Sequence, residues 1–246
     1  MIKLACTSRS FWRSFDDGSM DVMDFVAVCR NAALDGVDLD TRHVGSFDHA
    51  YLWEIKRACL RGGLSIANIA IPSNFTLPPS DLPAELEKVK TYIDLAAFLN
   101  APLVSLSPGS RESLDEAAWG RLVAYARAAA DYGETVGVTV AIHNDSPRGP
   151  LATGGDVLRL ANEVSHPNFG YAMQAGQFSD PAEGIRQTAR LALHVAAPVE
   201  LDISQTVGLL REAGYNGFVA LDLSGEADPQ AALVRAAPAL RSLLFA

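Results

Sequence analysis

LLREAGYNGFVALD, residues 209–222, is the stretch of sequence that decides the fold. Its first half has the apolar spacing of an amphipathic helix and stops at Gly214, a residue type that commonly follows the last turn of a helix. Its second half, residues 218–222, is a short apolar run that ends on a charged residue, Asp222. A helix that leads through a short turn into a buried strand is the repeating unit of parallel α/β folds.

The same unit repeats outward from this stretch along the whole chain. Expected helices include residues 20–34, 84–99, 114–135 and 203–213. The expected strands cover residues 2–6, 36–39, 64–71, 103–107, 138–143, 169–174, 191–196 and 218–222. Eight strand–helix units predict parallel strands with right-handed crossovers, closed into a single (β/α)8 TIM barrel over residues 1–246. A doubly wound open sheet is the alternative, but no GxGxxG turn follows the first strand.

Local signals mark where several helices begin and end. Asp180 and Asp202 are expected to be N-caps, and Ser113 is expected to open a capping box. Gly133 is expected to end the helix that Ser113 begins.

The connections are longer after strands than before them. The segments leaving strands include residues 7–19, 41–48, 72–81 and 144–152. In a barrel these loops gather at one mouth, the face at which barrel enzymes bind their substrates. We therefore expect the functional site at the C-terminal ends of the strands.

The composition is that of a globular protein without a nucleic-acid or membrane partner. The chain of 246 residues carries a formal net charge of −9 and no run of Lys or Arg, which argues against nucleic-acid binding. No apolar run approaches the roughly 18 residues of a membrane span, and the N-terminus lacks the features of a signal peptide. Cys6, Cys29 and Cys59 are far apart in apolar surroundings, which predicts buried thiols and a cytoplasmic location.

Several segments carry a family resemblance in their order along the chain. They are DGVDLD (35–40), IAIPSNF (69–75), APLVSLSPG (101–109), GVTVAIHN (137–144), HPNFGYAMQAGQF (166–178) and the opening stretch. The ordered set resembles the sugar phosphate isomerase/epimerase family, within the xylose-isomerase-like TIM barrel superfamily. The resemblance implies a barrel enzyme that moves a proton beside a carbonyl group.

The resemblance also implies a divalent metal, Mn, Mg, Zn or Co, at the mouth. In that family a Glu, an Asp, a His and a Glu at the ends of strands five to eight hold the metal, and the two Glu residues are the acid/base pair. The matching positions here are His143, Gln174, Ala196 and Asp222. Hard cations prefer several carboxylate ligands, so the usual four-ligand set is absent. No metal ligand is predicted, and the cofactor is left open.

Strand alternation predicts which side chains point into the mouth. Residues two apart on a strand face the same way, so His143, Gln174 and Asp222 are expected to point inward. We expect His143 and Asp222 to be catalytic, with Asp222 or Asp145 orienting the imidazole, because such a pair shuttles protons near neutral pH. The expected substrate-binding residues are Gln174, Gln177, His194, Asn144, Asp145 and Asn68. One layer deeper lie Ala141, Ala172, His194 and Ala220.

Three functions are compatible with these features. The first is an isomerase, epimerase or lyase acting on a small polyol, sugar, sugar phosphate or sugar acid. Arg9 and Arg148, on loops at the mouth, would suit an anionic group of such a ligand. The second is a non-catalytic barrel that binds a carbohydrate-like ligand. The third, a zinc-dependent DNA-repair endonuclease of the same superfamily, is disfavoured by the net charge of −9 and the five His residues. The resemblance also allows a homodimer.

Overall fold

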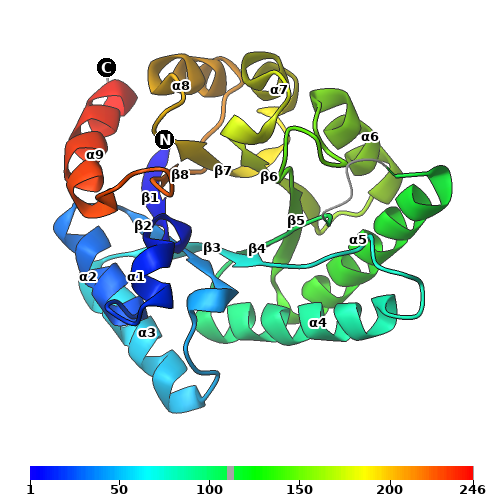
Figure 1. The fold of residues 1–246 in the computed structure, drawn as a ribbon, viewed down its shortest axis with the longest axis horizontal. Helices are drawn as coiled ribbons and strands as arrows, with labels where there is room; N and C mark the ends of the chain where they lie inside the picture. Colours follow the sequence, from blue (N-terminus) through cyan, green and yellow to red (C-terminus); the bar gives the residue numbers. More distant parts are fainter. Residues whose placement is uncertain (110–113, 246) are drawn as a thin grey trace.

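The computed structural model describes residues 1–109 and 114–245 of the chain. Within them β1 to β8 pair in sequence order, each parallel to its neighbours, and β8 pairs with β1 to close the barrel (Figure 1). The strands are β1 (Lys3–Thr7), β2 (Gly36–Asp40), β3 (Ser65–Ile71), β4 (Leu103–Leu106), β5 (Thr139–His143), β6 (Phe169–Gln174), β7 (Ala192–Pro198) and β8 (Phe218–Asp222). The predicted TIM barrel is confirmed.

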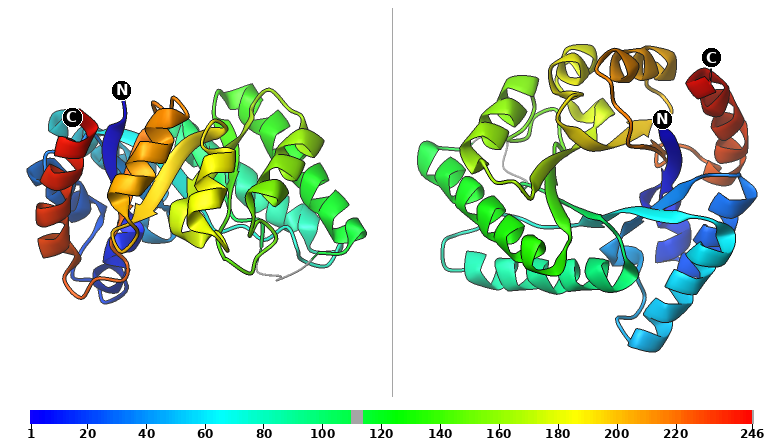
Figure 2. Two further views of the ribbon diagram at one scale, coloured as in Figure 1. Left: turned by 90° about the horizontal axis from the view of Figure 1, so that it is seen from above. Right: turned by 180° about the vertical axis from the view of Figure 1, so that it is seen from behind.

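Helices form the outer ring around this barrel, as the views from above and behind show (Figure 2). They are α2 (Val22–Asn31), α3 (His49–Gly62), α4 (Leu82–Leu99), α5 (Glu116–Val136), α6 (Gly154–Val164), α7 (Pro181–Thr188), α8 (Ile203–Glu212) and α9 (Pro229–Phe245). The short helix α1 (Trp12–Asp16) lies in the connection between β1 and α2 and has no buried residue. Short 3-10 turns, η1 (Ser8–Phe11), η2 (Thr41–His43) and η3 (Ala175–Gln177), follow β1, β2 and β6. No helix in the described ranges is long and apolar enough to cross a membrane.

The predicted helix starts at Asp180 and Asp202 are confirmed, because each carboxylate accepts a backbone N–H of the first turn. The predicted stop at Gly133 is wrong. Helix α5 continues to Val136 and ends at Gly137, which has a left-handed φ of 74°. Gly133 instead allows helix α5 to lie close to the backbone at Val138, since a Cβ at this position would lie 2.5 Å from the carbonyl oxygen of Val138. Ser113 lies outside the described residues, and Asp115 is the N-cap of α5.

Two different layers of side chains lie on the two faces of the strands. Branched aliphatic residues such as Leu4, Leu39 and Ile142 are buried in the main apolar core, which the helices cover. Small residues form separate clusters inside the barrel, as the alternation predicts. These clusters contain Ala5, Ala67 and Ala220 in one case and Leu103, Ala141 and Ala172 in the other. Barrel interiors are usually filled by branched side chains, so the small residues here leave room for polar groups.

Candidate active site

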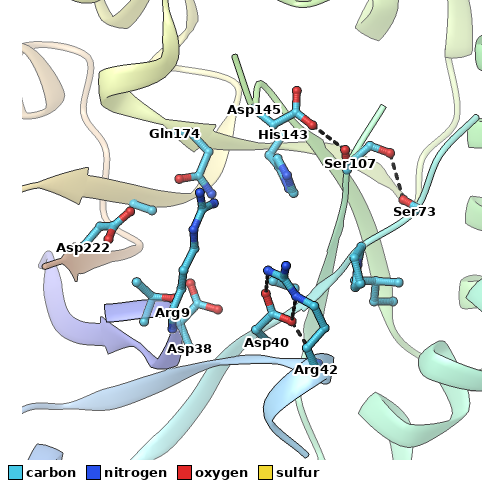
Figure 3. A pocket seen from close by; sticks show the side chains of 15 residues that line it. Arg9, Asp38, Asp40, Arg42, Ser73, Ser107, His143, Asp145, Gln174 and Asp222 are labelled. Carbon is cyan, nitrogen blue, oxygen red and sulfur yellow. Dashed lines mark hydrogen bonds and ion pairs between the residues drawn. The ribbon is translucent and has the colours of Figure 1, made fainter. Parts of the chain in front are cut away.

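A cavity of about 380 Å³, called here the inner cavity, opens at the C-terminal ends of the strands (Figure 3). Most of its lining is polar. The lining residues are Thr7, Arg9, Asp38, Asp40, Arg42, Ala70, Ile71, Pro72, Ser73, Ser107, His143, Asp145, Gln174, Ala196 and Asp222.

Three of the predicted site residues meet in this cavity because each one ends its strand. His143 ends β5, Gln174 ends β6 and Asp222 ends β8. Ala196 of β7 lies in the same lining, so the four positions matched to the family's metal ligands do surround one space. Asp145, two residues beyond His143, also lines the cavity.

His143 is a buried imidazole in the lining of the inner cavity. Only 9% of its surface is exposed. Burial lowers the pKa of the imidazole below 6.5, and the charge of Arg9 acts in the same direction against the opposing carboxylates of Asp145, Asp38 and Asp40. Its Nδ1 is buried and has no hydrogen-bond partner in the described part of the chain. The ring is therefore neutral at neutral pH and can accept a proton.

The two carboxylates that we predicted to orient the imidazole of His143, Asp145 and Asp222, have other partners. Asp145 accepts a hydrogen bond from the hydroxyl of Ser107, and Asp222 accepts one of 2.9 Å from the backbone N–H of Ser224. Among the described residues, neither carboxylate is hydrogen-bonded to His143. The orientation of the imidazole by one of them therefore stays a prediction.

A buried polar network forms the floor of the inner cavity. Asp38 accepts hydrogen bonds from His194 Nε2 and Asn68 Nδ2, both at 2.9 Å, and Asn68 Nδ2 also lies 2.9 Å from the hydroxyl of Ser105. All four residues are almost completely buried. Of these, only Asp38 lines the cavity. His194 and Asn68, which we predicted to bind substrate, lie beneath it and hold Asp38 in place.

Asn144 and Gln177 also lie outside the lining of the inner cavity. Asn144 is fully buried, and its amide bonds the backbone N–H and carbonyl of Gln174 at 2.9 and 3.0 Å. It also accepts a hydrogen bond from the hydroxyl of Tyr171. Asn144 therefore fixes the end of β6, and so positions Gln174. Gln177 lies in η3, half-buried.

Sequence reasoning missed the ion pair between Asp40 and Arg42. The guanidinium of Arg42 donates two hydrogen bonds to the carboxylate of Asp40, from Nε at 2.9 Å and from Nη2 at 2.5 Å. Burial alone would raise the pKa of Asp40, but the hydrogen bonds and charge of Arg42 outweigh it and lower the pKa below 3.8. A signal was present, because Asp38 and Asp40 are charged residues two apart in an otherwise apolar strand, and this spacing places both inside the barrel.

The donor set does not fit the divalent metal that the fold family implies. Three of the four matching positions offer an imidazole, a carboxamide and a methyl group, where the resembled family has two carboxylates and a histidine. In the described ranges, no group of three or more His, Cys, Asp or Glu is placed to hold a metal ion. Two guanidinium groups, of Arg9 and Arg42, line the cavity (Figure 3). Each of these two side chains adds a positive charge to the lining.

Comparisons with solved structures agree with this fold. The chain resembles D-psicose 3-epimerase, solved in the presence of D-fructose, with a TM-score of 0.83, 16% identity and 100% of both chains covered. It resembles the probable 3-DHS dehydratase of Bacillus anthracis with a TM-score of 0.82 and 16% identity, over 98% of this chain and 99% of that one. It resembles 3-keto-D-glucoside 4-epimerase of E. coli with a TM-score of 0.80 and 14% identity, over 98% and 100%. At these identities the likeness concerns the fold.

A match to a known sequence family covers most of the chain. No curated protein matches the sequence. The family model described as xylose isomerase-like TIM barrel matches residues 26–243. The chain therefore belongs to the xylose isomerase-like TIM barrel family.

Proposed function

We propose that this protein is an enzyme that moves a proton at a carbon next to a carbonyl group of a small sugar, polyol-derived ketone or sugar acid. His143 removes the proton as the general base, which leaves an enediolate. Return of a proton to the same carbon from the opposite face completes an epimerisation. Return to the neighbouring carbon, together with transfer of the hydroxyl proton from one enediolate oxygen to the other, completes an isomerisation. Loss of a neighbouring hydroxyl as water instead completes a dehydration.

One observation carries this proposal, namely a buried imidazole that lines a polar cavity and whose Nδ1 has no hydrogen-bond partner among the described residues. The lowered pKa of His143 keeps it able to accept a proton at neutral pH, and a base tuned in this way is typical of proton-transfer sites. We assign the second proton carrier to Asp222 and a hydrogen bond to the substrate oxygen to Gln174. Arg9 and Arg42 supply the positive charge that favours the enediolate.

The lining of the inner cavity favours a polyhydroxy ligand. Its volume of about 380 Å³ is near the small end for ligand pockets. Carboxylates and guanidinium groups offer paired hydrogen-bond acceptors and donors, which suit neighbouring hydroxyl groups. The similar structures described above, two epimerases and a probable dehydratase, are compatible with this substrate class.

A second candidate is a barrel that binds a carbohydrate-like ligand without turning it over. The observation that favours it is the loss of two carboxylates and the histidine from three of the four positions at which the resembled family holds its metal. Asp145 would then serve with Asp38 and Asp222 to bind hydroxyl groups.

The two candidates separate in an exchange experiment in D₂O. The protein is incubated with a panel of ketoses, aldoses and keto acids, with and without a chelator and with added Mn²⁺, Mg²⁺ or Zn²⁺, and ¹H NMR follows deuterium uptake beside the carbonyl. We expect uptake with at least one compound, and a loss of about 10²- to 10⁴-fold in His143→Gln. His166→Gln is the matched control, because His166 pairs with Asp131 and does not line the inner cavity.

No uptake under any condition, together with a ligand-induced rise in melting temperature, would establish the binding protein instead. An equal loss in both histidine variants would remove His143 from the role of base.

Two broader expectations are part of the proposal. We infer a cytoplasmic location from the buried free thiols of Cys6, Cys29 and Cys59. A homodimer is a further hypothesis, which light scattering of the purified protein tests.

A further inference from the structure

A second hollow of about 330 Å³, called here the outer hollow, adjoins the inner cavity. Arg9 and Arg42 line both spaces, so the two are neighbours across these side chains. The outer hollow is lined by Arg9, Trp12, Asp16, Arg42, His43 and Ser224. Asp16 is the only carboxylate among these lining residues.

The two arginines that border the outer hollow have guanidinium donors without a partner among the described residues. Arg42 uses Nε and Nη2 to hold Asp40, which leaves Nη1 without a partner in the described ranges. Arg9 makes no side-chain hydrogen bond or ion pair with any described residue, although it lines both spaces. Its charge lies close enough to His143 to act on the imidazole. An arginine fork without a protein partner is the usual means of binding a planar or tetrahedral oxyanion.

His43 adds a third hydrogen-bond donor, its Nε2–H, because the Ser8 hydroxyl at Nδ1 determines the tautomer of the ring. The backbone N–H of Asp40 donates to the hydroxyl oxygen of Ser8 at 2.9 Å, and this hydroxyl lies 2.9 Å from His43 Nδ1. The hydroxyl proton of Ser8 has no other acceptor among the described residues, so donation to Nδ1 is the arrangement that satisfies it. The neutral ring then carries its hydrogen on Nε2. Stacking on Phe15, with ring centroids 4.2 Å apart, holds the ring in place.

We propose that the outer hollow is an oxyanion subsite, which binds the phosphate or carboxylate group of a ligand whose polyhydroxy part occupies the inner cavity. Arg9 is the central residue, and Arg42, His43 and the hydroxyl of Ser224 complete the donors. The division of labour between the two spaces rests on the proposed function. The binding of an oxyanion by the outer hollow does not, and it can be measured without turnover.

Isothermal titration with inorganic phosphate, and separately with acetate, tests the subsite in the full chain. We expect one of the two anions to bind, and Arg9→Gln to weaken its binding about tenfold or more, the loss expected when charge-assisted hydrogen bonds are removed. Arg9→Lys should recover part of the affinity, because it restores charge without the fork. Arg148→Gln is the matched control, since Arg148 is an exposed arginine of another mouth loop that lines neither space.

Each outcome decides the proposal. Phosphate binding that depends on Arg9 identifies a phosphate subsite, and acetate binding with the same dependence identifies a carboxylate subsite. Absence of binding by both anions, or equal affinities in wild type and Arg9→Gln when circular dichroism shows both folded, overturns it. Deuterium uptake with an uncharged sugar, without anion binding, would leave the proposed function standing and remove only the subsite.

Discussion

The inside of the barrel and the layer outside its strands are built from opposite kinds of residue, and β2 carries both. Leu39 points outward into the apolar core and is completely buried. Its neighbours Asp38 and Asp40 line the inner cavity. Elsewhere the outer layer is branched and aliphatic, whereas the interior clusters contain mainly alanine beside a histidine and carboxylates.

This difference separates what stabilises the fold from what equips the site. Burial of a branched aliphatic side chain contributes about 1.5–3 kcal/mol, so the outer layer stabilises the barrel. A buried carboxylate costs free energy unless it is fully paired, and replacement of such a pair by apolar residues is often neutral or stabilising. The interior therefore holds groups that stability alone does not require, and its alanines leave space for a ligand.

The sharpest test of this difference is removal of the interior carboxylate at the floor. Asp38→Ala leaves His194 Nε2 and Asn68 without their shared partner in a buried place. We expect the free energy of unfolding in urea to fall by about 4 kcal/mol, as when one partner of a buried pair is lost. Asp145→Ala, at a partly exposed carboxylate of the cavity rim, should lose about 1 kcal/mol or less. Equal losses in the two variants would mean that the floor network is not special.

The next largest effect is expected on the outer face of the same strand. Leu39→Ala should lower the free energy of unfolding by about 3 kcal/mol through lost burial and the cavity that remains. Anion binding and deuterium uptake by the folded fraction should change little, because Leu39 does not line the cavity. Measurement of urea unfolding together with ligand affinity checks both parts. A large loss of affinity in folded Leu39→Ala would contradict the separation of the two layers.

A smaller effect is expected from the ion pair at the end of β2. Because Arg42 keeps the pKa of Asp40 below 3.8, this pair contributes stability above about pH 4, which is lost as the pH falls through the lowered pKa. Arg42→Gln should therefore cost about 1 kcal/mol at pH 7, since the arginine side chain is 59% exposed, and the deficit should vanish in acid. Thermal unfolding from pH 7 to pH 3 follows it. A deficit that stays constant over this range would contradict the pair's role.

The sequence predicts the side of the inner cavity formed by the ends of β5, β6 and β8 better than the side formed by β1 and β2. His143, Gln174 and Asp222 were predictable because each ends a short apolar run, and the period-two alternation of a strand determines which of its faces is inward. Gln174 meets Asn144 through a bond between neighbouring strands, which no local pattern encodes. The expected substrate contact of Asn144 is thus replaced by a supporting one.

The side formed by β1, β2 and the turns after them depends on contacts between residues that are far apart in the sequence. The hydrogen bonds from Asp40 through Ser8 to His43 join the turn after β1 to the turn after β2, which the pairing of these two strands brings together. Asp38 of β2 meets His194 of β7 across the barrel interior, and this contact depends on closure of the barrel. Arg9 was predictable as a cation at the mouth, but its place between two cavities was not.

The pH dependence of kcat/KM for deuterium uptake tests the central claim most directly, namely that a neutral His143 is the base. Burial lowers the pKa of His143 below 6.5 in the ligand-free protein, so the imidazole stays unprotonated until the solution is more acidic than that. We predict that kcat/KM, which reports groups of the free enzyme, is constant from pH 8 down to about pH 6.5 and falls below it, and that the residual uptake of His143→Gln lacks this acidic limb. An acidic limb with a midpoint above 6.5, or one that persists unchanged in His143→Gln, would contradict the account.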